Sequence, residues 1–149
     1  MIQIAWRHGL YMFLGFTLIF VLALISNNVD NYHIRYINLG IQALFIWLAL
    51  KKQRRTHEGF QDEVMSNFPS GVALGMMTSV IAYFPFSLGV SIFLRESPNT
   101  MEAIRLSTGF GEYLSPFFVG VMIFAEGVAF ALIGSYIITR IIQAGKQPV

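Results

Sequence analysis

Four long apolar stretches, separated by shorter polar segments, dominate the pattern of the chain. They run from about Gly9 to Ser26, Ile34 to Leu50, Ser70 to Leu94 and Leu114 to Ile138. A helix needs about 20 mostly apolar residues to cross a bilayer, and the stretches are close to that length. The second is the shortest, with Arg35 and Asn38 near its start. The pattern predicts an all-α integral membrane protein, a bundle of four transmembrane helices in one domain over residues 1–149.

Two of the polar segments predict shorter helices. Between the second and third stretches, an amphipathic pattern at helical spacing is made by Phe60, Val64, Met65 and Phe68. It predicts a short helix that lies in the cytoplasmic interface. Between the third and fourth stretches, Ser97 before Pro98 is typical of a helix start, and the Thr108 to Gly111 segment of a helix end. We expect this outer helix to cover the bundle; a ligand lid is the alternative.

Composition agrees with a membrane protein and excludes several classes of site. Hydrophobic residues make up 55% of the chain and charged residues 12%, too few to cover a soluble globule. The chain has no Cys, which rules out thiolate metal sites, disulfides and thiol catalysis. The apolar stretches hold no His, no Asp and no paired carboxylates. We therefore expect no enzyme activity, no metal and no cofactor, and the net charge of +2 gives no reason to expect nucleic acid.

Basic residues are unevenly distributed between the two predicted sides of the membrane. Seven lie on the side of the chain ends and the middle segment, and three, Arg35, Arg95 and Arg105, lie on the other. The seven are Arg7, Lys51, Lys52, Arg54, Arg55, Arg140 and Lys146. Basic residues favour the cytoplasmic side, so both ends and the middle segment are predicted to be cytoplasmic. The run from Lys51 to Arg55 is interpreted as a determinant of topology, or alternatively as a docking site for anionic lipid headgroups.

Small residues recur along the third and fourth stretches at the spacing of one helix face. Gly71 and Gly75 begin a row on the third, continued by Ser79. The fourth carries two overlapping rows, made by Gly120, Gly127 and Gly134 and by Gly127, Ala131 and Ser135. Small residues let helix backbones approach closely in lipid. The third and fourth helices are predicted to pack tightly against each other or against a partner chain. Pro85 interrupts the third stretch, which predicts a kink or, as the alternative, a hinge.

Glu126 is the only acidic residue within the four apolar stretches and lies near the middle of the last one. A charge at that depth costs roughly 2.5 to 3.5 kcal/mol on insertion scales. We therefore expect Glu126 to have a hydrogen-bonding partner, to be protonated or to have a function. Counting from the ends of the stretches places four hydrogen-bonding side chains at a similar depth: Thr17, Gln42, Ser79 and Tyr83. No Lys, Arg or His lies in the same layer. We therefore expect a neutral Glu126 acid, hydrogen-bonded inside the bundle.

Two functions are compatible with this polar layer. In the first, Glu126 fixes the packing of helices or the binding of a partner, and the protein is an accessory or assembly subunit of a larger membrane complex. In the second, Glu126 carries a proton or cation in a small oligomeric transporter, because acids within the membrane mark such relays. The first is favoured, since four helices hardly enclose a pathway. The expected partners are membrane lipid and other membrane subunits or further copies of the chain.

The order of the segments resembles a known family. A basic end of the second helix is followed by Gly59-Phe60-Gln61-Asp62-Glu63-Val64, by Gly71 and Gly75 at the entry to the third helix, and by a last helix that ends Ala131-Leu132-Ile133-Gly134-Ser135-Tyr136-Ile137-Ile138. This order is similar to that of the DUF4199 family, small four-helix membrane proteins, mostly of Bacteroidota, without an established function. The resemblance implies a bacterial inner membrane and no catalytic residues.

Overall fold

The computed structural model describes residues 1–26, 33–57, 68–109 and 111–144. These residues form helices and contain no strand, so the all-α prediction is confirmed for this part of the chain. Three helices are long and apolar enough to cross a membrane: Ile2–Ile25, Pro69–Glu96 and Pro116–Ile142. The predicted second span is not among the three within the described residues. Three such helices are compatible with a multi-pass membrane protein.

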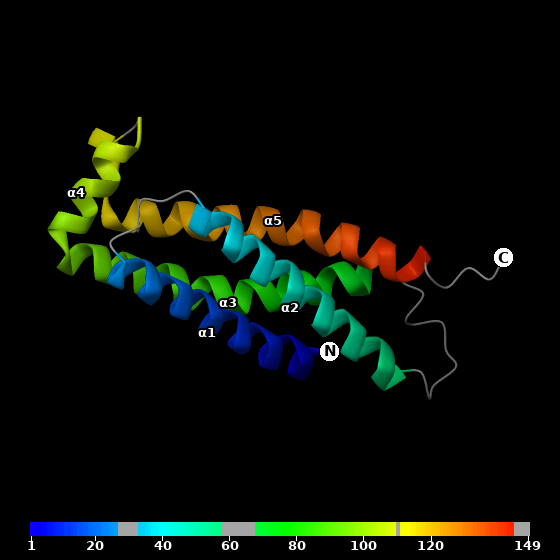
Figure 1. Ribbon diagram of the computed structural model, residues 1–149. Helices are drawn as coiled ribbons and strands as arrows, with labels where there is room; N and C mark the ends of the chain where they lie inside the picture. Colours follow the sequence, from blue (N-terminus) through cyan, green and yellow to red (C-terminus); the bar gives the residue numbers. More distant parts are fainter. Residues whose placement is uncertain (27–32, 58–67, 110, 145–149) are drawn as a thin grey trace.

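The described elements are α1 (Ile2–Ile25), α2 (His33–His57), α3 (Phe68–Glu96), α4 (Pro98–Ser107), the short 3-10 helix η2 (Gly111–Tyr113) and α5 (Pro116–Ala144). The four long helices lie side by side and alternate in direction (Figure 1). The start of α1 and the ends of α2 and α5 lie at one end of the bundle, and α4 lies at the other. Each carbonyl inside a helix accepts a bond from its own helix, which is what a chain in lipid requires.

The helices are longer than the apolar stretches that predict them. The α1 helix begins at Ile2, and α5 continues to Ala144. The α2 helix continues through the basic run to His57, because Lys, Gln and Arg are good helix formers once the chain has left the apolar stretch. The predicted interfacial helix lies largely outside the described residues, and Phe68, its last predicted position, is the first residue of α3.

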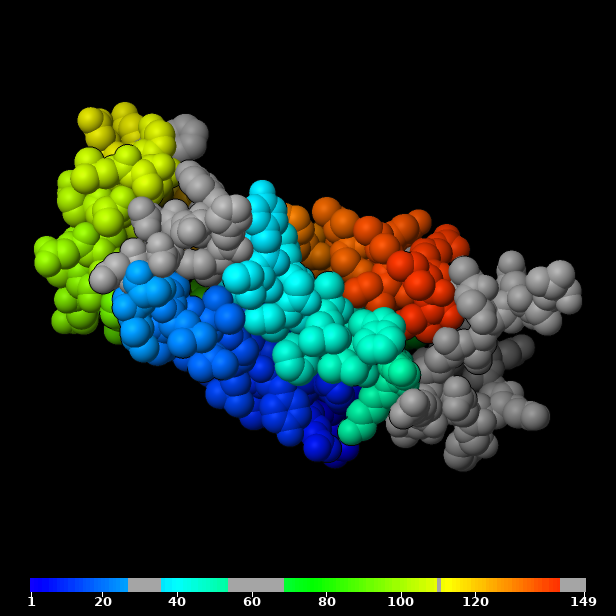
Figure 2. Space-filling view, viewed as in Figure 1, coloured from blue at the N-terminus to red at the C-terminus, as the bar shows by residue number. Residues whose placement is uncertain are grey.

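The α3 helix is the centre of the bundle. It makes its most extensive contacts with α5, then with α1, and it also contacts α2. The α2 helix in turn contacts α1, α3 and α5, and in the space-filling view it lies between α1 and α5 on the front face (Figure 2). The α1 and α5 helices therefore lie at opposite edges of the bundle, and each has one side that no other long helix covers.

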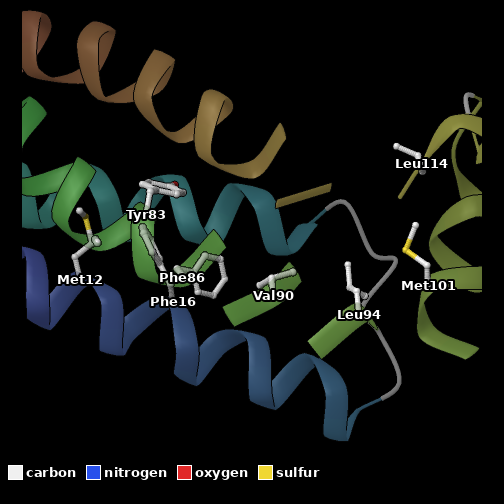
Figure 3. Packing of buried hydrophobic residues seen from close by; sticks show 9 residues of the cluster. Met12, Phe16, Tyr83, Phe86, Val90, Leu94, Met101 and Leu114 are labelled. Carbon is white, nitrogen blue, oxygen red and sulfur yellow. The ribbon is translucent and has the colours of Figure 1, made fainter. Parts of the chain in front are cut away.

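Two hydrophobic clusters fill the interior. One contains Ala5, Ile46, Ala49, Leu50 and Leu74 and lies toward the end where α1 begins. The other extends toward α4, and its members include Met12, Phe16, Tyr83, Phe86, Val90, Leu94, Met101 and Leu114 (Figure 3). The rings of Phe16 and Tyr83 lie with centroids 4.7 Å apart, and those of Phe16 and Phe86 5.6 Å apart. Tilted aromatic pairs of this kind lock α1 against α3.

The end of the bundle opposite the start of α1 is covered by α4, which begins at Pro98 and ends at Ser107, as predicted. Ser97 is its N-cap residue but makes no side-chain cap hydrogen bond. Met101 is buried against the larger cluster, and the Arg105 guanidinium donates to the Leu114 carbonyl from Nε at 3.1 Å and from Nη2 at 2.9 Å. This forked bond ties α4 to the segment just before α5. Within α3 itself, the α-helix is continuous across Pro85.

Candidate functional site

A buried polar layer joins α2, α3 and α5 in the middle of the bundle. Gln42 of α2 is only 2% exposed. Its Nε2 donates to the Gly127 carbonyl at 2.9 Å and to Ser79 Oγ at 3.3 Å, and its Oε1 accepts from the Tyr83 hydroxyl at 3.3 Å. We call Gln42, Ser79, Tyr83 and the Gly127 carbonyl the Gln42 layer. Because a buried amide is costly without partners, these three bonds fix the rotation of α2 against the α3–α5 pair.

Two members of the predicted layer do not enter it. Thr17 Oγ1 donates to the Phe13 carbonyl of its own helix at 2.9 Å, the usual use of a Thr hydroxyl within a helix. Glu126 is exposed on the surface of the four-helix unit. Within the described part of the chain its carboxyl group has no hydrogen bond. The expectation of a Glu126 acid hydrogen-bonded inside the bundle is therefore wrong for the described residues.

The rotation of α5 about its own axis explains why Glu126 lies outside the Gln42 layer. Gly127 faces α3 and is buried, and a step of one residue turns a helix side chain by about 100°, so its neighbour Glu126 points away from α3. The exposed residues of α5 that surround Glu126 are apolar: Met122, Ala125, Ala129, Phe130 and Ile133. We call this surface, with Glu126, the outer face of α5. A single acid therefore lies in an apolar surface at the middle of a membrane helix.

Close backbone contacts join α3 and α5 along a seam of small residues. A Cβ atom added to Gly127 would lie 2.5 Å from three ring carbons of Tyr83, and one added to Gly71 would lie 2.7 Å from Thr139 Cγ2. At Gly75 the added atom would meet Ser135, and at Gly120 it would meet Ser91. Ala131 is fully buried between these points. Only glycine allows approaches this close, which is how helices gain packing energy in lipid.

Gly134 differs from the other small residues of its row. The nearest atom to an added Cβ would be Ile46 Cδ1, at 4.0 Å. The seam follows Gly127, Ala131, Ser135 and Thr139 instead, because this is the row that α5 turns toward α3. Within the described residues, Ser135 Oγ and Thr139 Oγ1 are buried without a hydrogen-bond partner. They lie against Gly75 and Gly71, where a Cβ atom added to either glycine would meet them.

Basic side chains cover aromatic rings at the end of the bundle where α1 begins. Arg7 Cζ lies 5.9 Å from the ring centroid of Tyr11, Lys51 Nζ 4.7 Å from that of Trp47, and Arg140 Cζ 5.8 Å from that of Tyr136. The pairs come from α1, α2 and α5, and each joins residues four apart, which are neighbours on a helix surface. We call them the basic–aromatic pairs. Lys52 is exposed beside them, while the side chains of Arg54 and Arg55 lie outside the described residues.

Comparison with known protein families, with curated proteins and with solved structures finds no match to this chain. The resemblance to the DUF4199 family therefore stays a prediction. Function has to be argued from the side chains themselves.

Several contributors to this geometry are not identified by sequence reasoning. The Gly127 carbonyl receives the shortest bond of the Gln42 layer, and a backbone group carries no sequence signal. Gly9 lets α1 approach α3, since an added Cβ would lie 2.8 Å from the Thr78 carbonyl oxygen. The basic–aromatic pairs do have a signal, namely the spacing of four residues between each cation and its ring.

Proposed function

We propose that this protein is an accessory or assembly subunit of a larger membrane complex, and that it binds its partner through the outer face of α5. The observation that carries the proposal is the placement of Glu126, exposed in the middle of a candidate membrane span and without a hydrogen bond in the described part of the chain. Lipid tails offer neither donor nor acceptor. An acid on this surface is stabilised when another protein helix covers it.

The interior of the unit supports the same conclusion. Gln42, Ser79 and Tyr83 bond to one another and to the Gly127 carbonyl, so the polar side chains expected to receive Glu126 already have partners. The layer holds the bundle together without the acid. Glu126 is therefore available to a neighbour, and its cost in lipid, roughly 2.5 to 3.5 kcal/mol if charged, favours association.

The same placement makes the transporter less favourable than assembly. A carrier residue within one four-helix unit would face the space between its helices, whereas Glu126 faces away from them. A pathway would have to lie between this chain and its neighbours. Transport remains testable through E126Q, which would abolish a proton-linked flux if Glu126 carried the proton.

We also propose that α2 crosses the membrane, which makes four spans, with both ends of the chain in the cytoplasm of a bacterial inner membrane. The support is that α2 lies alongside the candidate spans and that its Lys51–Trp47 pair lies at the same end as those of α1 and α5. Cations and aromatic rings together favour a membrane surface, and an excess of cations favours the cytoplasmic one.

This topology can be tested with single cysteines, because the chain has none of its own. In intact cells, a membrane-impermeant maleimide should label Y36C, at the start of α2, and E112C, in η2. K52C, at the far end of α2, should be labelled only after the membrane is opened. Equal access of Y36C and K52C from one side would show that α2 does not cross.

Assembly is tested by purifying the tagged protein from its native membrane in mild detergent. We expect defined membrane proteins or further copies to come with the wild type and to be lost with A129W, which enlarges the outer face of α5. The matched control is L18W, on the surface of α1, where Leu18 is 60% exposed. Recovery of every variant as a homogeneous monomer would contradict the proposal.

A further inference from the structure

We propose that the helix covering the outer face of α5 is α5 of a second copy of this chain, and that the two Glu126 carboxyl groups meet across a two-fold axis. The inference rests on the proposed function, because it names the partner of the same surface. It makes the smallest assembly a dimer that places two four-helix units back to back.

The first support is hydrogen-bond complementarity. A neutral carboxyl group has one O–H donor and a carbonyl acceptor, so two of them satisfy each other through reciprocal O–H···O bonds. A two-fold axis brings identical groups together, and a self-complementary group is what such an interface requires. Among the described residues, the middle of the candidate spans holds no Lys, Arg or His, so a second copy offers the acid itself and no counter-charge.

The second support is the shape of the surface beside Glu126. Ala125 and Ala129 are both exposed and lie four residues apart, so two small side chains stand in the middle of the face. Met122 and Ile133 flank them on either side along the helix. Small residues at this spacing let two backbones approach, and close approach brings the carboxyl groups of opposing helices within hydrogen-bonding distance.

The open side of α1 provides the internal comparison. Its exposed side chains at the middle of the span are Leu14, Leu18, Val21 and Leu22. Large aliphatic side chains suit lipid and keep another backbone at a distance. The two edges of the bundle are thus of different kinds: α1 carries no polar group and no small pair there, and α5 carries both. Of these two edges, α5 is therefore the one that offers a second copy both a hydrogen-bonding group and a close approach.

Disulfide formation between single cysteines tests the contact directly. We expect A129C and A125C to give disulfide-linked dimers on mild oxidation in native membranes, with at least one of them well above L18C on α1. Equal yields at the three positions, or no yield on α5, would overturn the inference. Because a cysteine on the face can itself disturb the contact, energy transfer between labels on K52C, away from the face, provides a second measure of self-association in lipid vesicles.

Substitution of the acid separates the possible partners. E126Q should keep self-association within about threefold, since an amide also donates and accepts. E126L should weaken it about 3- to 30-fold, the range expected for interhelical hydrogen bonds of roughly 0.6 to 2 kcal/mol. Loss with E126Q as well as E126L would indicate a cationic partner helix and would overturn the acid pair.

The experiments distinguish failure of the assembly role from failure of the second copy as the partner. If other membrane proteins are lost with A129W while K52C labels show no self-association, the assembly role stands and the second copy is wrong. If neither partner proteins nor self-association are found, both are wrong.

Discussion

The two faces of α5 carry similar small and apolar side chains, but one face is covered by α3 and the other is exposed. On the inner face, Gly127 meets the Tyr83 ring and Ala131 is fully buried, so a small-residue row is closed by α3. On the outer face, Ala125 and Ala129 form another small pair beside Glu126, and no described residue covers them. The polar groups differ in the same way: Gln42 has three bonds to its layer, and Glu126 has no hydrogen bond in the described chain.

On our proposal, α5 serves two interfaces, one within the chain and one with a partner. A closed small-residue row, beside which Gln42 makes its three hydrogen bonds, holds one chain together, and its substitution should alter stability. We propose that the open row with Glu126 binds a second chain, so its substitution should alter association while leaving the fold intact. The variants below test that division, from the largest expected effect on stability to the smallest.

The inner seam is most sensitive at Gly127. G127A places a methyl group 2.5 Å from ring carbons of Tyr83, so the helices must separate or the buried ring must move. We expect a loss of about 3 kcal/mol in the free energy of unfolding, the upper end for overpacking. The control is G134A on the same helix, where the nearest atom would be 4.0 Å away and little change is expected. Denaturation in detergent micelles measures both, and equal effects would break the assignment of the seam.

The Gln42 layer comes next. Q42M keeps the approximate volume of the side chain but removes its bonds to Ser79, Tyr83 and Gly127. We expect a loss of about 2 kcal/mol in the free energy of unfolding, from three bonds of roughly 0.6 kcal/mol or more each. T17V is the control, because Thr17 bonds only to its own helix, and it should cost less than about 0.5 kcal/mol. A T17V effect as large as that of Q42M would place Thr17 in the layer after all.

The basic–aromatic pairs should contribute less. R140Q removes the cation above Tyr136, and Y136L removes its ring. Each should lower the free energy of unfolding by about 0.5 to 1 kcal/mol, the range for exposed cation–π contacts. The double variant should cost less than the sum of the two. Strict additivity in this double-mutant cycle would show that the pair contributes no energy.

Glu126 should matter least to the fold of the single chain. E126L replaces an exposed acid that has no hydrogen bond to any described residue, so the unfolding free energy of the dissociated monomer should change by less than about 0.5 kcal/mol. Its effect belongs to association. A large loss of monomer stability would instead place Glu126 with Gln42 as a structural residue of the interior.

Sequence reasoning predicts how deep a residue lies along the bundle better than it predicts whether the residue faces the interior or the surface. Apolar length locates the long helices, and counting from their ends places Gln42, Ser79 and Tyr83 at one level, where the structure brings them together. Direction is different, because lipid is as apolar as the interior and the outward residues of α5 are as hydrophobic as the inward ones. The pattern therefore cannot show that Gly127 turns inward and Glu126 outward.

The boundaries show a second limit of the same kind. The length of an apolar stretch reflects the thickness of the bilayer, whereas a helix ends where its backbone hydrogen bonds end. The α2 helix therefore continues past its apolar stretch, through Lys51 and Lys52, to His57. Within the described residues, α2 is not among the candidate spans. Its role as a fourth span is a proposal that the cysteine labelling above can decide.

The central claim is that protein covers the outer face of α5 in the native membrane. Photo-crosslinking in living cells tests it without any assumption about the partner, with a photo-reactive residue in place of Ala129 and, as the control, in place of Leu18. The account predicts a protein adduct at position 129 and none at position 18, and an adduct of about twice the 16.8 kDa of the chain if the partner is a second copy. Adducts at neither position, or equally at both, would contradict it.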